Sequence, residues 1–394
     1  MQNFHYYTPT QVVFGRDTEV QSGSLVKQYG GTKVLVHFGG KSAVQSGLLD
    51  RVCKSLEKEG ISYITLGGAQ PNPRLSLVQK GIDLCKKEKV DFLFAVGGGS
   101  VIDSCKAIGY GLANDCPVWD IYDRKTAPKA CAPIGCVVTI AAAGSEMSDS
   151  SVITNEDGNQ KRGFSSDYCR LKFAIMNPEL TCTLPAWQTA SGCTDIIMHT
   201  LERWFSSSDD NSQLIDSIAV ALIKTVITNA QILVTDPTNY NARAEIMWAG
   251  SLSHNGLTGP YGNGDWACHQ IEHELGGMFD VTHGAGLAAV WGTWARYVYK
   301  HNIKRFAELA VQVFNLPKPS KDNEEQTALE GISRMESFFK SINMPTSISQ
   351  LGLTLTDAQC EQLAHNCTWN LSRTVGCVQK LSKAELTEIY KLAR

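Results

Sequence analysis

The stretch DFLFAVGGGSVIDSCKAIGYGL, residues 91–112, decides the fold of the first half of the chain. Residues 91–96 have the composition of a buried strand, three glycines follow, and a helical pattern begins at Ser100. Glycines between a strand and a helix let backbone amides approach a phosphate, and the helix N-terminus attracts its charge. GGGS is not the usual GxGxxG fingerprint, so a tight turn without a ligand also fits. We expect Ser100 to cap the helix and Asp103 to complete a capping box.

The same alternation of strand and helix runs through the first 180 residues or so. Further apolar runs read as strands, and amphipathic segments between them read as helices; the strands are 33–38, 62–66, 91–96, 133–140 and 173–178, and the helices 43–58, 74–88 and 100–112. Such alternation predicts a parallel sheet covered by helices. Residues 4–15 look like a separate strand pair, in which Pro9 argues against a central position.

A second glycine turn, VHFGGKSA at 36–43, follows an earlier strand of this region. Two such turns in one sheet can bracket one dinucleotide, although Gly-Gly after a strand is also common without a ligand. An acidic side chain in this loop often binds the ribose of NAD, whereas a 2′-phosphate needs donors or positive charge. The loop carries Lys41 and Ser42 and no Asp or Glu, which favours NADPH over NADH.

After the prolines near 180–185 the pattern becomes helical. We expect helices at 186–205, 212–232, 239–257, 265–277, 284–299, 325–341, 356–367 and 383–393, with a surface loop at 318–326. The chain is therefore predicted to have an α/β dinucleotide-binding domain with a parallel sheet at 1–182, followed by an all-α metal-binding domain at 183–394. The active site is expected in the cleft between them.

The helical half contains a sparse set of metal-type residues. Asp195 and His199 are four apart, His269 and His273 are four apart, and His283 follows. Residues at i and i+4 share one helix face, so each pair can direct two ligands at one point. Alone, Asp195 fits a helix cap and each histidine fits a core or surface residue, as we expect of His254, His301 and His365. Together they predict one site for a divalent metal such as Zn²⁺, Fe²⁺, Mn²⁺ or Co²⁺, and spacing does not separate His269 from His273.

Bulk properties exclude several classes. The net charge is −3, which argues against nucleic acid or an anionic membrane as the main partner. The start of the chain is not that of a signal peptide, and uninterrupted apolar runs stay below the roughly 18 residues of a membrane span. Thirteen scattered cysteines without a CxxC fit reduced thiols in a cytoplasm. Cys193 and Cys268 are expected to neighbour the metal rather than bind it.

Taken in order, the motifs resemble those of the iron-dependent (group III) alcohol dehydrogenases, and within them the butanol dehydrogenase and broad-range NADPH aldehyde reductase branch. The resemblance covers nearly the whole chain and rests on YYTPTQVVFG (6–15), PNP (71–73), GGGSVIDSCKAI (97–108), AAAGSEMS (141–148), NPELTCTLP (177–185), TDIIMHTLE (194–202) and CHQIEHELGGMFDVTHGAG (268–286).

The resemblance implies roles for particular residues. The metal ligands are Asp195, His199, His269 and His283, and His273 lies beside them as a candidate for proton transfer. The implied cofactor residues are Gly39, Gly40, Lys41 and Ser42 near the adenosine; Gly98, Gly99 and Ser100 at the pyrophosphate; and Asp103, Thr139 and Lys161 along the nicotinamide. Asn72 also lies in a motif that contacts the cofactor in the family. The family often has Thr where this chain has Ala143, which puts one cofactor contact in doubt. A homodimer is implied as well.

These observations predict reversible hydride transfer between NAD(P)H and a small aldehyde or primary alcohol, with Fe²⁺ or Zn²⁺ as the metal. Three alternatives stay open: a dehydroquinate synthase-like lyase, a glycerol dehydrogenase-like enzyme on the same scaffold, and a non-catalytic protein with a structural metal. The lyase needs a basic cluster for a phosphorylated substrate, and residues 243–300 hold few basic side chains. A closed structural metal site usually contains cysteine ligands.

Overall fold

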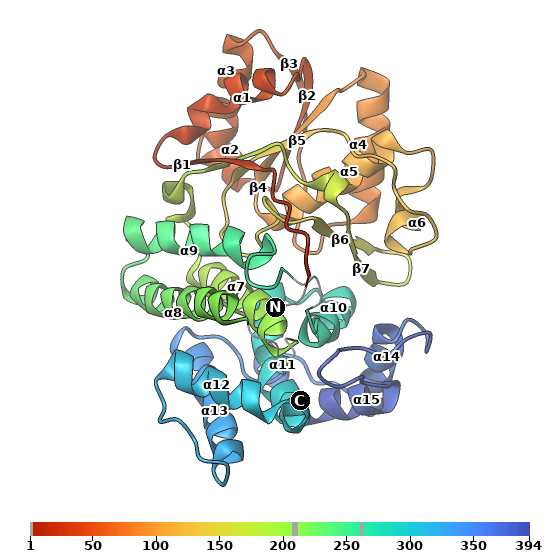
Figure 1. The fold of residues 1–394 in the computed structure, drawn as a ribbon. Coiled ribbons are helices and arrows are strands. Elements are labelled where there is room, and N and C mark those ends of the chain that lie inside the picture. The colour runs from red at the N-terminus through yellow and green to blue at the C-terminus, as the bar shows by residue number, and fades with distance from the viewer. Residues whose placement is uncertain (1–2, 207–211, 261–263) are drawn as a thin grey trace. The chain divides into compact units, whose positions relative to one another are not determined.

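The computed structural model describes residues 3–206, 212–260 and 264–394 and divides the chain into two compact units. One unit is Tyr7–Leu184; the other is Pro185–Arg394 together with the N-terminal residues up to Tyr6 (Figure 1). The division lies beside the 182/183 boundary expected from the sequence.

The first unit is built on a parallel sheet. Within the described residues its strand order is β1-β8-β5-β4-β2-β3, and each neighbouring pair is parallel. The strands are β1 Gln11–Phe14, β2 Lys33–Phe38, β3 Ser62–Leu66, β4 Phe92–Gly97, β5 Ile134–Val138 and β8 Phe173–Met176. The predicted parallel sheet is therefore confirmed.

Helices cover both faces of this sheet, because its central strands are apolar on both sides. Val34, Val36 and Phe94 join one core with Val52 and Leu56 of α3. The opposite face is covered by α4 and α5, which pack closely on each other: a Cβ on Gly81 would lie 2.5 Å from Ile108. The helices of this unit are α1 Ser22–Gln28, α2 Ser42–Gln45, α3 Leu48–Lys58, α4 Leu75–Glu88, α5 Gly99–Ala113 and α6 Val118–Tyr122.

Two local expectations were wrong, and one element was missed. Residues 4–15 do not form a separate strand pair, since β1 joins the main sheet at its edge, with Gln11 in register with Phe173 of β8. The expected capping box on α5 is absent because the helix begins one residue early, at Gly99, with Gly98 as its cap residue. An antiparallel hairpin of β6 Ser150–Asn155 and β7 Gln160–Ser165 was not anticipated.

Helices are the main regular elements of the second unit's described part, with an isolated antiparallel bridge between Val375 and Leu381. Its helices are α7 Ala186–Phe205, α8 Gln213–Thr235, α9 Tyr240–His254, α10 Ala267–Phe279, α11 His283–Val298, α12 Ile303–Phe314, α13 Glu324–Ser341, α14 Asp357–Cys367 and α15 Lys383–Leu392. Helix α12 was missed by the sequence prediction. Helix α8 is long and apolar enough to cross a membrane by length and composition alone, with 33% of its most apolar window buried. A single helix of this kind is weak support for a membrane span, since core helices of soluble proteins pass the same test, and α8 packs against α7 and α9.

Candidate metal centre and glycine-loop site

Three helices of the second unit carry the predicted metal ligands. Asp195 and His199 are one turn apart on α7, His269 lies in the first turn of α10, and His283 is the first residue of α11 (Figure 1). These helices pack on one another, α11 against both α7 and α10. Residues far apart in the sequence therefore reach one point.

The four side chains meet at one oxygen of Asp195. Its Oδ1 lies 3.4 Å from Nδ1 of His199, 3.5 Å from Nε2 of His269 and 3.5 Å from Nε2 of His283. A divalent metal binds imidazole and carboxylate atoms at about 2.0–2.2 Å, so the donor atoms of a tetrahedral site are about 3.3–3.6 Å apart. The spacing around Asp195 matches that of metal ligands.

The hydrogen bonding of these atoms also fits a metal. Among the described residues, Oδ1 of Asp195, Nδ1 of His199 and Nε2 of His269 are buried and accept or donate no hydrogen bond. Burying an unpaired polar atom is costly, and one such atom in a native core needs an explanation. Three of them facing one another are explained by a cation, and one carboxylate with imidazoles suits Fe²⁺ or Zn²⁺.

Glu202 lies behind His269 and is fully buried. Its Oε2 accepts a hydrogen bond from Nδ1 of His269 at 2.9 Å, and its Oε1 accepts one from the backbone N–H of the same residue at 3.0 Å. Because Nδ1 donates to Glu202, Nε2 is the ring atom that faces Asp195 and is available to a metal when it carries no proton. A carboxylate in this position fixes both the tautomer and the orientation of a ligating histidine.

Glu272 makes the equivalent contact with Nδ1 of His283 and is also fully buried. Neither glutamate was predicted from the sequence as a site residue. A signal was present, since Glu202 is three residues after His199 and Glu272 is three residues after His269, which places each on the ligand face of its helix.

The electrostatics of the histidines differ. Burial, followed by the nearby His254 and His269, holds the pKa of His199 well below its usual range, so this ring is neutral. Burial lowers the pKa of His269 too, but the charges of Glu202 and Asp195 outweigh it and raise the pKa to about 9. The same carboxylates that favour a proton on His269 favour a metal cation beside it.

Two glycines of the HGAG segment allow this arrangement. A Cβ on Gly284 would lie 1.9 Å from the carbonyl oxygen of Ser191, so only glycine lets the start of α11 approach α7 this closely. A Cβ on Gly286 would lie 2.7 Å from Cγ of Glu272. Glycine at 284 thus brings His283 to Asp195, and glycine at 286 leaves room for Glu272.

His273 lies beside this group. Its ring centroid is 5.6 Å from that of His283 and 6.4 Å from that of His269, and it groups with Glu272 and His283 rather than with Asp195. This arrangement is compatible with a residue near the metal that does not bind it, and the role remains a prediction.

Two other neighbours of the ligand group were not predicted from the sequence. His254, which we expected to be an ordinary core or surface histidine, has its ring centroid 4.0 Å from that of His199. Trp266 has its ring 6.0 Å from His199 and 5.3 Å from His269. Trp266 precedes His269 by three residues at the start of α10, a spacing that was not used as a signal. Cys193 and Cys268 are buried free thiols outside the ligand group.

The two glycine turns of the first unit lie at the ends of adjacent strands. Gly39 and Gly40 follow β2, and Gly98 and Gly99 follow β4, which pairs with β2. The chain leaves β2 for β3 on one side and returns to β4 on the other, so this point is a topological switch. In open parallel sheets, ligands bind at the carboxyl ends of strands at such a point. We call this edge of the sheet, marked by Gly39, Gly40, Gly98 and Gly99, the glycine edge.

The other predicted cofactor residues surround the same edge of the sheet. Thr139 follows β5 and donates its backbone N–H to the carbonyl of Gly97 at 3.0 Å. Asn72 is buried in a left-handed conformation, with φ 54°, in the loop after β3. Lys161 is buried in β7 and pairs with Thr154 of β6. Thr154 in turn donates its backbone N–H to the carbonyl oxygen of Pro73 at 2.8 Å, which ties the hairpin to the loop after β3. Ser100 lies in the first turn of α5, and Lys41 and Ser42 are exposed.

Asp103 organises the loop between β5 and β6. Its carboxylate accepts from the hydroxyl of Ser145 at 2.6 Å and from the N–H of Val152 at 2.9 Å. The buried Lys106, one turn later, donates to the carbonyls of Ser145, Ser148 and Ser150.

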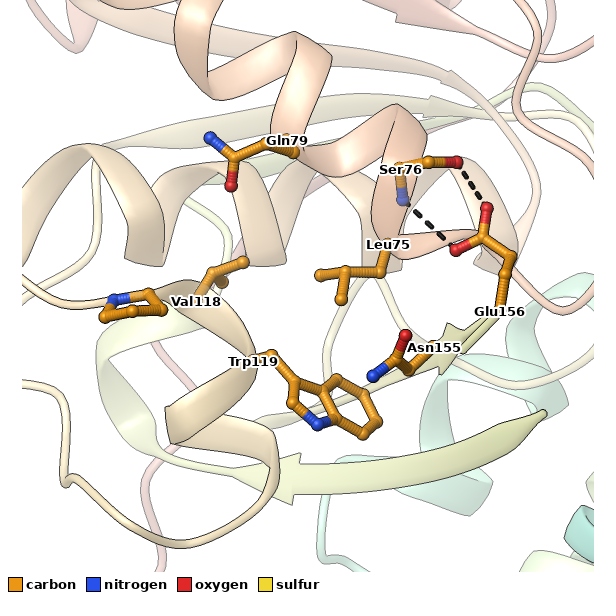
Figure 2. A pocket seen from close by; sticks show the side chains of 8 residues that line it. Leu75, Ser76, Gln79, Val118, Trp119, Asn155 and Glu156 are labelled. Atoms are coloured by element: carbon orange, nitrogen blue, oxygen red, sulfur yellow. Dashed lines mark hydrogen bonds between the residues drawn. The ribbon is translucent and has the colours of Figure 1, made fainter. Parts of the chain in front are cut away.

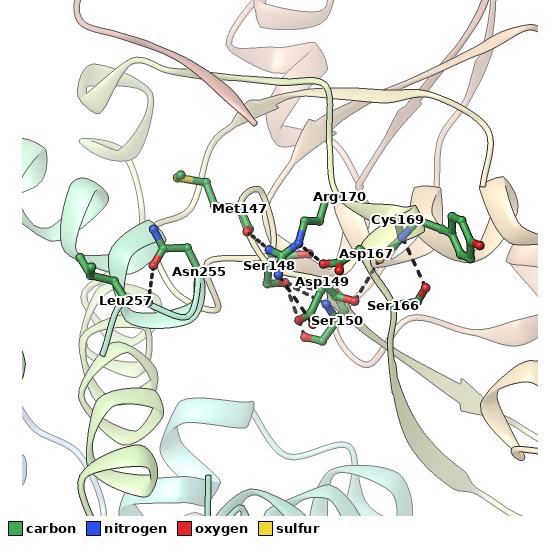
Figure 3. A network of polar contacts seen from close by, with 12 residues as sticks. Met147, Ser148, Asp149, Ser150, Ser166, Asp167, Cys169, Arg170, Asn255 and Leu257 are labelled. Atoms are coloured by element: carbon green, nitrogen blue, oxygen red, sulfur yellow. Dashed lines mark hydrogen bonds and ion pairs between the residues drawn. The ribbon is translucent and has the colours of Figure 1, made fainter. Parts of the chain in front are cut away.

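Arg170 holds this loop from another side (Figure 3). It donates to the carbonyl of Met147 at 2.9 Å and pairs with Asp167 at 2.6 Å. The AAAGSEMS segment that follows the glycine edge is therefore fixed by charged side chains of α5 and of the segment after β7.

A separate surface cavity of about 300 Å³ lies in the first unit, between α4, α6 and β6 (Figure 2). Trp119 and Leu75 form its apolar part. Its carboxylate, Glu156, accepts from both the N–H and the hydroxyl of Ser76 and so caps the first turn of α4. This cavity is distinct from the glycine edge, and its charged group is already engaged.

Comparison with known proteins identifies the family. Residues 9–178 match the family model "Iron-containing alcohol dehydrogenase", and residues 189–394 match "Fe-containing alcohol dehydrogenase family, C-terminal". The chain is 39% identical over 391 residues, 99% of both chains, to a probable NADH-dependent butanol dehydrogenase 1 of Bacillus subtilis. It is 33% identical over 358 residues, 90% of both chains, to the NADPH-dependent aldehyde reductase YqhD of Escherichia coli.

A crystal structure named as NADH-dependent butanol dehydrogenase A from Thermotoga maritima superposes with a TM-score of 0.95 at 35% identity, covering 100% of this chain and 99% of that chain. Matches of this extent and identity, together with the metal-type cluster and the parallel sheet, establish that the chain belongs to the iron-containing alcohol dehydrogenase family.

Proposed function

We propose that this alcohol dehydrogenase transfers hydride reversibly between NAD(P)H and a short aldehyde or primary alcohol, using one divalent metal held by Asp195, His199, His269 and His283. The observation that carries the proposal is the group of buried, unpaired ligand atoms around Asp195. When bound, Fe²⁺ or Zn²⁺ supplies Lewis-acid polarisation of a carbonyl or alcohol oxygen.

The protein residues have distinct tasks in this proposal. Asp195 supplies the anionic ligand atom. Glu202 and Glu272 hold His269 and His283 with their Nε2 atoms toward it. His273, beside His283 but outside the Asp195 group, exchanges the alcohol proton directly or through water, a role that is typically worth ~10²–10⁴-fold in rate.

The cofactor is proposed to bind at the glycine edge of the parallel sheet. Backbone amides of Gly98, Gly99 and Ser100 at the start of α5 suit a pyrophosphate. Gly39, Gly40 and Ser42 suit the adenosine, with Asn72 beyond β3. Asp103, Thr139 and Lys161 are proposed to lie along the nicotinamide, and Asp103 would act there through the loop that it already orders.

We propose a preference for NADPH over NADH. Lys41 and Ser42 are exposed directly after Gly40, and GGKS contains no carboxylate to repel a 2′-phosphate. The names of the relatives include both NADH-dependent and NADPH-dependent enzymes, so the preference rests on the loop itself.

We also propose that the enzyme is a cytoplasmic homodimer. The thirteen cysteines are all free thiols, which fits a reducing compartment. The dimer is proposed from the family resemblance.

Steady-state kinetics on butanal with each cofactor test the proposal. We expect a higher kcat/KM with NADPH. Replacing Gly40 with Asp should lower kcat/KM for NADPH more than for NADH, because the new carboxylate repels a 2′-phosphate. The site has room for the change, since no atom lies within 4 Å of a Cβ at Gly40. A clear NADH preference in the unmodified enzyme would overturn the cofactor assignment, and no aldehyde-dependent oxidation of either cofactor would overturn the function.

A further inference from the structure

Trp266 is an aromatic side chain beside the metal ligands that the proposed mechanism does not use. It directly precedes α10 and is half-buried. Its ring lies 5.3 Å from His269 in an edge-on arrangement, 6.0 Å from His199 and 5.9 Å from His254. Trp266 therefore lies on the flank of the ligand group formed by His199 and His269, whereas His273 lies beside His283.

The backbone of Trp266 is held in an unusual conformation. Its φ of 59° lies in the left-handed region, which a bulky residue rarely adopts. Asp265 fixes the chain there: its Oδ1 accepts from the N–H of Ala267 at 3.1 Å, and its Oδ2 accepts from Cys377 at 2.6 Å and from Val378 at 2.7 Å. The conformation is thus set by a buried carboxylate that ties two distant segments together.

The indole itself is also held. The guanidinium of Arg203 lies over the ring, 4.6 Å from its centroid. Arg203 in turn donates to the carbonyls of His199 at 2.8 Å and Ser253 at 2.9 Å. On another side the ring covers Gly264, where a Cβ would lie 2.5 Å from the indole.

We propose that Trp266 forms a rigid wall of the substrate site and determines which aldehydes the enzyme accepts; this inference rests on the proposed function. A rigid indole beside the ligands offers a flat apolar surface to the carbon chain of a substrate whose oxygen is at the metal. Such a wall favours unbranched alkyl chains and disfavours chains that are branched next to the carbonyl.

The test compares Trp266→Ala with the unmodified enzyme on butanal and 2-ethylbutanal. Pockets typically discriminate between substrates differing by a methylene by about 10–200-fold. We expect the ratio of kcat/KM for 2-ethylbutanal to that for butanal to rise at least ~10-fold in Trp266→Ala and less in Trp266→Phe. Alanine carries a Cβ as tryptophan does, so both face the same steric cost in the left-handed backbone, and the comparison is chiefly one of side chains. Trp248→Ala, which removes a 39% exposed tryptophan from α9, is the matched control and should leave the ratio unchanged.

A binding measurement complements the kinetics. Butyramide and 2-ethylbutyramide carry a carbonyl that is not reduced, and calorimetry on metal-loaded protein gives their affinities. We expect the variant to gain relative affinity for the branched amide while keeping its metal. An unchanged selectivity in both assays would overturn the proposal, and so would loss of metal from Trp266→Ala, which would make the residue a support for the ligands. An unmodified enzyme inactive on every aldehyde would refute the proposed function instead, and the amide affinities would still decide whether Trp266 is a wall.

Discussion

Replacing Glu202 with Gln should weaken metal binding although Glu202 is not itself a ligand. The carboxylate accepts two hydrogen bonds from His269, at 2.9 and 3.0 Å, in a fully buried position. A glutamine has one acceptor and one donor there. Either its amide N–H faces the backbone N–H of His269, or it faces Nδ1 and forces the ring proton onto Nε2, the atom needed by the metal.

The size of the effect follows from the lost interaction. A hydrogen bond to a charged group contributes about 1.5–3 kcal/mol. With about 1.4 kcal/mol per tenfold change, the metal Kd should rise roughly 10- to 100-fold, the range found for partners behind metal ligands. Competition with a chromophoric chelator measures this Kd directly.

A matched control is Glu330→Gln, which makes the same chemical change in an exposed ion pair with Arg334. Its metal Kd should equal that of the unmodified enzyme. If Glu202→Gln binds metal as tightly as the control while remaining folded, then Glu202 does not orient His269 and the account of the site is wrong.

Three further outcomes are expected. His273→Ala should keep its metal yet lose ~10²–10⁴-fold in kcat, whereas His269→Ala should lose both; metal analysis beside kinetics separates them, and loss of metal from His273→Ala would make it a ligand. Gly286→Ala should displace Glu272, because the new Cβ would lie 2.7 Å from Cγ of Glu272. The variant should lose about 1–3 kcal/mol of unfolding free energy in urea and should also bind metal more weakly. An unchanged unfolding free energy would contradict the packing of Gly286 against Glu272. Burial lowers the pKa of the His37 ring from 6.5 to about 4. The contribution of the neutral, buried ring to folding stability is therefore complete above pH 6.5. It is lost as the pH falls toward 4, because in that range the unfolded chain binds a proton at His37 and the folded chain does not. When the pH is lowered from 7 to 5, the unmodified enzyme should lose about 2 kcal/mol more unfolding free energy than His37→Gln does. Parallel pH profiles of the two proteins would refute the lowered pKa of His37.

Much of the fold follows from local patterns in the sequence. The apolar runs and the glycines after them predict parallel strands with turns at one edge, and the structure places the turns of Gly39 and Gly98 after adjacent strands. The pairing of β1 with β8 was not predictable in this way, since Gln11 and Phe173 are separated by most of the first unit. Helix α12 and the β6–β7 hairpin carried usable signals, an amphipathic pattern and an Asp-Gly turn, that were not recognised.

The metal-type cluster was predictable in composition but not in detail. Helical spacing places His269 and His273 on the same face of α10, and only the packing of α7 and α11 brings His269 to Asp195. Likewise, Trp266 reaches the ligands through a left-handed backbone that no propensity favours. Tertiary packing decided these points, and single-sequence patterns do not contain it.

The central claim is tested most directly by measuring butanal-dependent NADPH oxidation while metal-free protein is titrated with Fe²⁺ or Zn²⁺ in the absence of oxygen. Activity should rise in proportion to bound metal and reach its plateau at one ion per chain, and His283→Ala should neither bind that ion nor gain activity. Full activity without metal, or a plateau reached equally by His283→Ala, would contradict a catalytic metal held by Asp195, His199, His269 and His283.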